Sequence, residues 1–344
     1  MVVSRGRRWV WVWMATWIAG AFVSTAHAGM LKGFNQAWIK TDYGRQWLDG
    51  VYDPVEAERL LSLAQAGGSS VVRMWLFEGA EPGSLLWDGH RMVGVRSDAQ
   101  DHLIDFLKRA RSHGQKVYLT LFDSWSKWES HPQIEVRNRW WNLLNQKFGA
   151  YEAFFDHVLR PTLQRISREG LLDQIFAVDF MNEWDSLLPR GQFEQSYSSA
   201  RDLLCRLSRD VRVLPERVRM SASVILWQGA SLGLQTALAC MDLLDFHVYD
   251  DWASMPGLRS IVARAHRQGI PVVLGEFGQL SHAYDDELQA RLTQRFLTQA
   301  REAGLEAALA WRLSDVRPGN NPEARFSFEA FGRTRPAWDV FRRF

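Results

Sequence analysis

The sequence predicts one (β/α)8 barrel with a small β-hairpin inserted after its second strand. Eight short runs rich in apolar and β-branched residues alternate with amphipathic stretches of helical length. The runs are apolar almost throughout, which is typical of parallel strands buried on both faces. No G-x-G-x-x-G turn or phosphate-binding loop follows the first run, so the usual reason to prefer an open doubly wound sheet is missing.

The elements follow one another in order. The predicted strands are 31–35, 70–76, 116–122, 175–181, 218–226, 243–249, 271–275 and 305–311. Three of the intervening helices have recognisable ends, because Asp, Ser or Pro opens a helix and Gly closes it. These helices are expected between 53 and 68, between 97 and 114, and between 285 and 304. Asp88-Gly89, between apolar flanks in 85–93, predicts the hairpin turn.

Residues 1–28 have the pattern of a secretory signal peptide. Three arginines precede an apolar run over 9–23, and Ala-His-Ala at 26–28 forms a small-residue cleavage site. The alternative is an uncleaved membrane anchor, but an apolar run of about 15 residues is shorter than the roughly 20 that span a bilayer. The prediction is therefore an exported protein, periplasmic or secreted, whose functional barrel is 29–344.

Charge and composition exclude several classes of partner. Removing residues 1–28 takes away three arginines, so 41 basic and 39 acidic side chains become 38 and 39. A chain this close to neutral has no electrostatic footprint for nucleic acid or an anionic membrane. Without repeats or low-complexity tracts, 29–344 is expected to be one domain and a monomer.

Cys205 and Cys240 lie in helical segments, where a disulfide and two buried thiols are equally compatible with the sequence.

Polar side chains stand at the ends of several predicted strands. In a barrel, catalytic groups project from the carboxyl ends of strands, and alternate residues along a strand point inward. This alternation predicts an inward set at the mouth: Arg73 and Trp75, Met181 and Glu183, Asp245, His247 and Tyr249, Val272, Leu274 and Glu276, and Leu309 and Trp311.

Glu183 and Glu276 point to glycoside cleavage, in which one carboxyl group protonates the leaving oxygen and the other attacks the anomeric carbon. Arg73 and Tyr249 are expected to hold Glu276 ionised, whereas Glu183 needs a raised pKa to act as the acid. Asn182 is suited to a sugar 2-hydroxyl. Taken one at a time, these residues have structural explanations as loop or core polar groups. The chemical interpretation rests on their joint pattern.

Tryptophans follow the same strand ends. Nine of the 13 outside residues 1–28 fall at or after predicted strand ends: Trp38, Trp75, Trp87, Trp125, Trp128, Trp184, Trp227, Trp252 and Trp311. Such a gathering is better explained by a groove that stacks sugar rings than by core packing alone. No metal or nucleotide cofactor is predicted, because the sequence lacks H-E-x-x-H, C-x-x-C and G-x-S-x-G motifs.

These motifs together resemble glycoside hydrolase family 5, most closely its endo-β-1,4-mannanase branch. They are "GFN" at 33–35, "VVRMW" at 71–75, "MNEW" at 181–184, "DFHVYDDW" at 245–252, "LGEFG" at 274–278 and "AWRLSD" at 310–315. The resemblance implies retaining hydrolysis of internal β-linked bonds in a polysaccharide, with Glu183 as acid/base and Glu276 as nucleophile. The expected supporting or substrate-binding residues are Arg73, Asn182, His247, Tyr249, Trp311, Trp75, Trp125, Trp184, Trp252 and Asp123.

Two features depart from the family pattern. Trp184 stands where the family commonly has proline, and the third strand ends without the histidine of many family 5 cellulases, which leaves Asp123 as a substitute polar contact. The sequence leaves open a β-glucan or exopolysaccharide hydrolase, a periplasmic transglycosylase, a membrane-tethered enzyme and a non-catalytic sugar-binding barrel. A retaining enzyme should have its two carboxyl groups about 5–5.5 Å apart, and an inverting one about 6.5–9.5 Å apart.

Overall fold

The computed structural model describes residues 29–39, 52–78, 83–124, 142–187, 193–225, 230–249, 256–279, 285–315, 325–330 and 332–344. Its main sheet contains eight parallel strands, in the order β7-β6-β5-β2-β1-β10-β9-β8. The strands are β1 (Leu31–Asn35), β2 (Val71–Trp75), β5 (Lys116–Asp123), β6 (Ile175–Asn182), β7 (Met220–Ser221), β8 (Leu244–Tyr249), β9 (Val272–Gly278) and β10 (Ala307–Ala310). A parallel bridge between Val224 and Phe246 joins the two outer strands and closes the barrel there.

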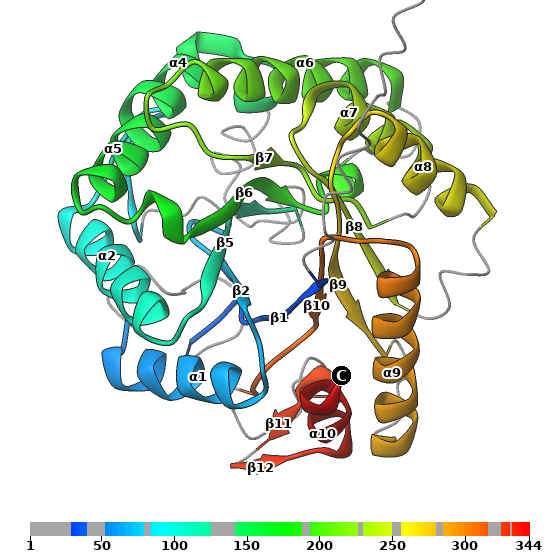
Figure 1. The fold of residues 1–344 in the computed structure, drawn as a ribbon. Coiled ribbons are helices and arrows are strands. Elements are labelled where there is room, and N and C mark those ends of the chain that lie inside the picture. The colour runs from blue at the N-terminus through cyan, green and yellow to red at the C-terminus, as the bar shows by residue number, and fades with distance from the viewer. Residues whose placement is uncertain are drawn as a thin grey trace, which may run out of the picture.

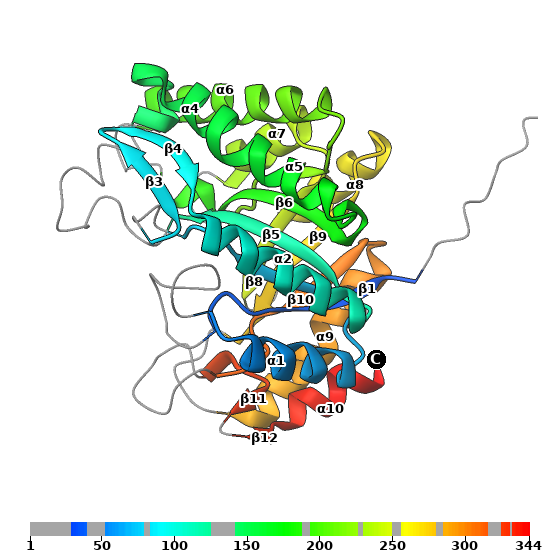
Figure 2. The same ribbon diagram turned by 90° about the vertical axis from the view of Figure 1, so that its left-hand side faces the viewer.

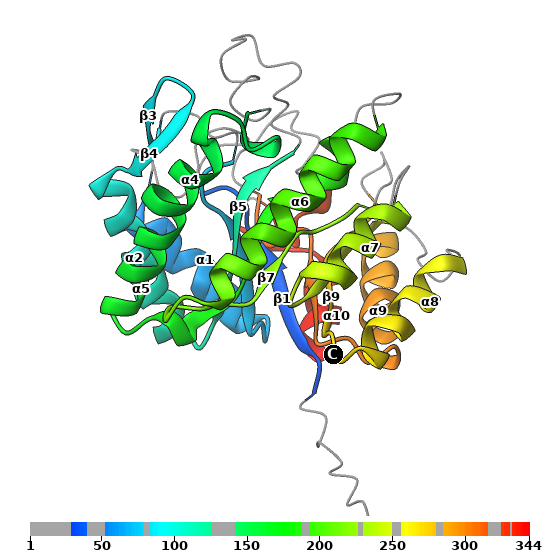
Figure 3. The ribbon, with the colours of Figure 1, turned by 90° about the horizontal axis from the view of Figure 1, so that it is seen from above.

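Helices surround this barrel on its outside (Figures 1 and 3). They are α1 (Pro54–Ala66), α2 (Ser97–Ser112), α4 (Ala150–Phe154), α5 (Arg160–Arg168), α6 (Phe193–Arg212), α7 (Ala230–Cys240), α8 (Pro256–Arg267), α9 (Asp286–Glu302) and α10 (Pro336–Arg343). A π-helical segment, Phe155–Leu159, joins α4 to α5, and short 3-10 turns cover Lys147–Gly149, Leu172–Gln174 and Trp184–Leu187. The predicted fold class is confirmed.

Local signals account for most of the helix ends that were predicted, although α2 begins at Ser97 without a side-chain cap. The Asp53 carboxylate accepts hydrogen bonds from the backbone of Val55 and Glu56 at the start of α1, and Asp285 accepts one from Leu288 at the start of α9. After the helices, Gly68, Gly114 and Gly304 adopt positive φ. Only glycine enters this region without strain, so these residues end the helices as predicted.

The hairpin after β2 is also confirmed. Strands β3 (Leu85–Asp88) and β4 (Arg91–Val95) pair antiparallel, and Gly89 lies in their turn with φ of 56°. The hairpin projects from one end of the barrel beside α4, as Figure 2 shows. A second small sheet pairs β11 (Glu329–Ala330) with β12 (Arg333–Thr334), just before α10.

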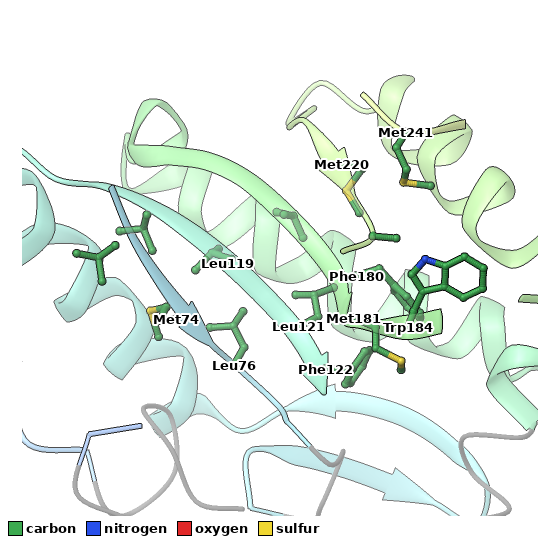
Figure 4. Packing of buried hydrophobic residues seen from close by; sticks show 14 of the residues in the cluster. Met74, Leu76, Leu119, Leu121, Phe122, Phe180, Met181, Trp184, Met220 and Met241 are labelled. Carbon is green, nitrogen blue, oxygen red and sulfur yellow. The ribbon is translucent and has the colours of Figure 1, made fainter. Parts of the chain in front are cut away.

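The apolar core has an outer and an inner part. Most buried side chains lie in an outer layer between strands and helices, some of which Figure 4 shows. Inside the barrel, Val71, Tyr118, Ala177, Val273 and Leu309 belong to a separate cluster. A third cluster gathers Ala37, Trp38, Trp75, Trp311 and Phe326, with Tyr249 packed against it. The barrel is thus a packed interior, as expected for this fold.

Simple alternation was wrong in two strands. In β9, Val272 and Leu274 pack in the outer layer, while Val273 faces inward. Phe246 pairs with Leu274 but His247 pairs with Glu276, so β9 carries one extra residue, Gly275. This β-bulge turns Glu276 into the barrel although Leu274 faces out.

In β6 the predicted inward position of Met181 was also wrong. Met181 packs in the outer layer beside Phe122 and Phe180 (Figure 4). Glu183, two residues later, has a positive φ of 52°. That left-handed conformation, uncommon for a residue with a side chain, directs Glu183 differently from Met181.

A disulfide joins Cys205 of α6 to Cys240 of α7, with the two Cα atoms 4.9 Å apart. The pairing answers the question that the sequence left open. The disulfide links two neighbouring helices on the outside of the barrel (Figure 3).

Within the described part of the chain, none of the helices combines the length and apolar character needed to cross a bilayer. Residues 1–28 lie outside the described residues, so the signal peptide and export remain predictions.

Candidate active site

Glu276 lies at the carboxyl end of β9, almost fully buried and held by two donors. The Arg73 guanidinium donates through Nη1 to Oε1 of Glu276 at 2.5 Å. The Tyr249 hydroxyl donates to Oε2 at 2.6 Å. Both predicted contacts are present. Tyr249 comes from β8, the strand next to β9, and Arg73 comes from β2, which is not a neighbour of β9. They fix the orientation of the carboxylate and place one charge-assisted hydrogen bond on each oxygen.

Arg73 has no exposed surface and organises the interior around it. Its Nη1 also donates to Oδ1 of Asn35 at 3.0 Å. Its Nη2 donates to Oδ2 of Asp179 at 2.8 Å and to Oδ1 of Asn182 at 2.9 Å. A buried guanidinium is stable only with carboxylate partners, and strands β1, β6 and β9 supply partners for both Nη atoms.

Glu183 follows β6 and is also buried. Its backbone N–H donates to Oγ of Ser223 at 3.1 Å, which anchors the unusual backbone conformation. Its Oε1 lies 2.8 Å from Nδ1 of His247. A carboxylate oxygen of Glu183, one of Glu276 and a ring nitrogen of His247 all lie within 4.8 Å of one another. The mouth of the barrel therefore brings together the two carboxyl groups singled out in the sequence.

Asn182 and Asp123 form the adjoining part of the site. The Asn182 amide Nδ2 donates to Oδ1 of Asp123 at 2.9 Å, while its carbonyl oxygen accepts from Arg73. Asp123 ends β5 beside Asn182 in the ladder between β5 and β6. Both side chains are held by protein contacts, and Asp123 contacts the residue that precedes the predicted acid.

Burial dominates the electrostatics of the site. Removal from water raises the pKa of Glu276 to about 7, although the charge of Arg73 and the hydrogen bond from Tyr249 both pull it down. The sequence predicted that these two donors would keep Glu276 ionised. They do lower its pKa, but burial raises that pKa by more. Burial and Arg73 together hold the pKa of His247 well below its usual value, so its imidazole is neutral near pH 7.

The tryptophans divide into two groups. Trp75 and Trp311 lie near each other with ring centroids 5.7 Å apart, and Trp38 packs edge-on against both. These rings belong to the cluster at the mouth that also contacts Tyr249. Trp184 was expected to contact substrate but instead packs in the outer layer with Met181 and Phe180 (Figure 4). Trp125, Trp128, Trp227 and Trp252 lie outside the described residues.

Three residues of the network were not predicted as site residues: Asn35, Asp179 and Ser223. The Asp179 carboxylate accepts from Arg73, from the Ser223 backbone and hydroxyl, and from Thr120. A signal for Asp179 was present, because a charged residue in the middle of an apolar strand requires a buried partner. Ser223 had no such signal in the sequence.

Glu183, His247 and Glu276 carry donor atoms of the kinds that bind metal ions. Here, however, His247 contacts Glu183, and Glu276 is paired with Arg73 and Tyr249. A guanidinium 2.5 Å from Glu276 supplies positive charge and repels a further cation. These pairings occupy the donor atoms that face one another and do not favour a metal centre.

The sequence matches no family model and no curated protein. The structure is similar to an exo-β-1,4-mannosidase from the Opitutaceae bacterium strain TAV5, with a TM-score of 0.66 and 17% identity over 92% of this chain; the match spans 59% of that longer chain. It is similar to a β-mannanase from the blue mussel Mytilus edulis, with a TM-score of 0.62, 17% identity and coverage of 92% and 93% of the two chains.

An endo-1,4-β-mannanase from Eisenia fetida gives a TM-score of 0.64 at 14% identity, with 92% of each chain covered. At such identities the likeness concerns the fold. The chain therefore shares the fold of these three proteins, in agreement with its own eight-stranded (β/α)8 barrel.

Proposed function

We propose that this protein is a retaining glycoside hydrolase of the family 5 type that cleaves a β-1,4-mannan-like polysaccharide. The observation that carries the proposal is the pair of buried glutamates at the barrel mouth, with oxygens within 4.8 Å of each other. An oxygen pair this close supports the separation of about 5–5.5 Å between carboxyl groups in retaining enzymes rather than the roughly 6.5–9.5 Å of inverting ones.

In the proposed first step, an oxygen of Glu276 attacks the anomeric carbon while Glu183 gives its proton to the departing glycosidic oxygen. The bond from the anomeric carbon to the leaving sugar breaks as the bond to Glu276 forms. Arg73 and Tyr249 hold the Glu276 carboxylate in place for this attack. In the second step Glu183 removes a proton from water, and that water displaces Glu276 with overall retention.

Three observations support the proposed substrate class. The sequence motifs are most like the mannanase branch, and the similar structures are named as mannanases and a mannosidase. Trp311, beside Tyr249, is the least buried of the three tryptophans in the aromatic cluster at 5% exposed, and it is suited to a sugar face. Trp38 and Trp75 are buried against it. We further propose that the chain is exported and then cleaved near residue 28, so that it meets an oligo- or polysaccharide outside the cytoplasm.

The test is release of reducing ends from a panel of soluble β-1,4-mannan, mixed-linkage β-glucan, β-1,4-glucan and xylan. The expected result is activity on mannan that disappears in Glu276→Ala and persists in Glu287→Ala. Glu287 is a matched control, since its side chain on α9 is 87% exposed. Proton NMR of the first product should show the β-anomer. The α-anomer would contradict the retaining mechanism, and silence of the wild type on all polymers would favour a specialised exopolysaccharide or a binding barrel.

A further inference from the structure

Beneath the two glutamates, two buried polar atoms face each other. Nε2 of His247 lies 3.9 Å from Oδ1 of Asp245, and neither residue is exposed. Within the described residues, neither atom has a hydrogen-bond partner. Buried polar atoms are rarely left in this state, so the pair calls for an explanation. Asp245 is not used by the mechanism above.

The contacts indicate where the proton of Asp245 lies. The Tyr118 hydroxyl donates to Oδ2 of Asp245 at 2.6 Å, and no other donor reaches this carboxyl group within the described part of the chain. The Asp179 carboxylate, by contrast, accepts hydrogen bonds from Arg73, Ser223 and Thr120. A carboxylate stays ionised in the interior only when several donors stabilise it. Asp179 has them and Asp245 does not.

The charges around Asp245 also indicate that its carboxyl group is protonated. The titratable groups around Asp245 are Arg73 on β2, Tyr118 on β5, Asp179 on β6, His247 on β8 and Glu276 on β9. The single guanidinium is already paired with Asp179 and Glu276. A third buried carboxylate would be uncompensated, which is costly. Burial accordingly raises the pKa of Asp245 to about 8, against the opposing pull of Arg73.

The bulge in β9 sets the position of Asp245. A Cβ atom on Gly275 would lie 2.1 Å from Oδ1 of Asp245, so only glycine leaves space for this carboxyl group. With Tyr118 on Oδ2 and Gly275 against Oδ1, the proton on Oδ1 has Nε2 of His247 as its facing acceptor.

We propose that Asp245 is a positioning residue whose protonated carboxyl donates to Nε2 of His247, so that Nδ1 carries the imidazole proton and donates to Glu183. The bond requires the two side chains to approach by about 1 Å, since 3.9 Å exceeds a hydrogen bond. The result is a chain of donors that runs from Tyr118 through Asp245 and His247 to Oε1 of Glu183.

This tautomer has a consequence for catalysis, and the consequence rests on the proposed function. With Nδ1–H donating to Oε1, the acid proton of Glu183 belongs on Oε2. In the other tautomer the lone pair of Nδ1 would face Oε1 and draw that proton between the two groups, away from a leaving oxygen. Asp245 thus decides which oxygen of Glu183 acts as the acid.

The test is a long-range proton–nitrogen NMR spectrum of protein labelled with 15N-histidine, recorded near pH 7 without substrate. His247 is assigned by its loss in His247→Asn. We expect a neutral ring protonated at Nδ1 in the wild type. Asp245→Asn should keep that tautomer, because its amide donates to Nε2 while its carbonyl accepts from Tyr118. Asp245→Leu should move the proton to Nε2, and turnover on mannan should fall about tenfold with KM nearly unchanged.

A wild-type ring protonated at Nε2 would overturn the proposal whether or not the Asp245 variants fold. So would an Nδ1 proton that persists in Asp245→Leu, or an Asp245→Asn spectrum that matches Asp245→Leu. Because the spectra need no substrate, a protein inactive on every polymer would defeat the proposed function and leave the tautomer measurable.

Discussion

The two halves of the barrel interior differ in chemistry although the same strands build them. The lower half is filled by Val71, Ala177, Val273 and Leu309, which pack by shape and volume. In the upper half Arg73, with its carboxylate and amide partners, forms a network in which each group depends on another. Loss of volume leaves a cavity, whereas loss of a partner leaves a buried charge unpaired. Substitutions in the two halves should therefore fail in different ways.

The largest expected effect is that of Glu276→Gln. Removing the proposed nucleophile should lower kcat on mannan at least about 10³-fold, while the amide keeps the volume of the site. Thermal unfolding should change little by comparison. Glu287→Gln, exposed on α9, is the control for the same chemical change. A Glu276→Gln protein with turnover within tenfold of the wild type would exclude covalent catalysis by this residue.

Arg73→Ala in the upper half and Leu309→Ala in the lower half compare how each half affects stability and turnover. Arg73→Ala leaves Asp179 and Glu276 without their guanidinium and should cost about 3–5 kcal/mol of unfolding free energy, with turnover reduced at least about 100-fold. Leu309→Ala should cost about 2–5 kcal/mol through its cavity, with turnover nearly kept. Denaturant titration measures the loss of unfolding free energy in each variant, and kcat measures the loss of turnover. Equal losses of turnover in both variants would remove the distinction.

The pH profile tests the electrostatics of the upper half. A nucleophile must be ionised, so kcat/KM should rise as pH increases through about 7, where Glu276 loses its proton. Tyr249→Phe removes a hydrogen bond that lowers this pKa, and the rising limb should move to higher pH with a roughly tenfold loss of kcat below pH 7. A limb that moves to lower pH in Tyr249→Phe would contradict the assignment.

The smallest effect on turnover is expected outside the barrel. Cys205→Ser with Cys240→Ser removes the link between α6 and α7, a loop with sequence separation 35. The chain-entropy relation gives a loss of about 3–4 kcal/mol in unfolding free energy. Because the link lies outside the barrel, turnover at 25 °C should stay within twofold. A tenfold loss of turnover in folded protein would show that the outer layer also sets the geometry of the mouth.

Much of this protein was determined by its sequence alone. The predicted strand from 31 to 35 matches β1 at both ends, and the strands from 116 and 175 begin at the predicted residues. Caps at Asp53 and Asp285, the hairpin turn at Gly89, and both glutamates at the mouth were also foreseen. These features depend on hydrophobic period, capping and turn chemistry, which act over a few residues and are therefore visible in a linear chain.

The tertiary structure alone decided which way several side chains point. The bulge at Gly275 arises from the pairing of β9 with both of its neighbours, and it turns Glu276 inward where alternation would have placed it with Leu274. The backbone at Glu183 and the outward packing of Trp184 depend on Ser223 and the outer layer. Partners that meet across the barrel are far apart in sequence, as Arg73 and Glu276 are, and no local pattern encodes their contact.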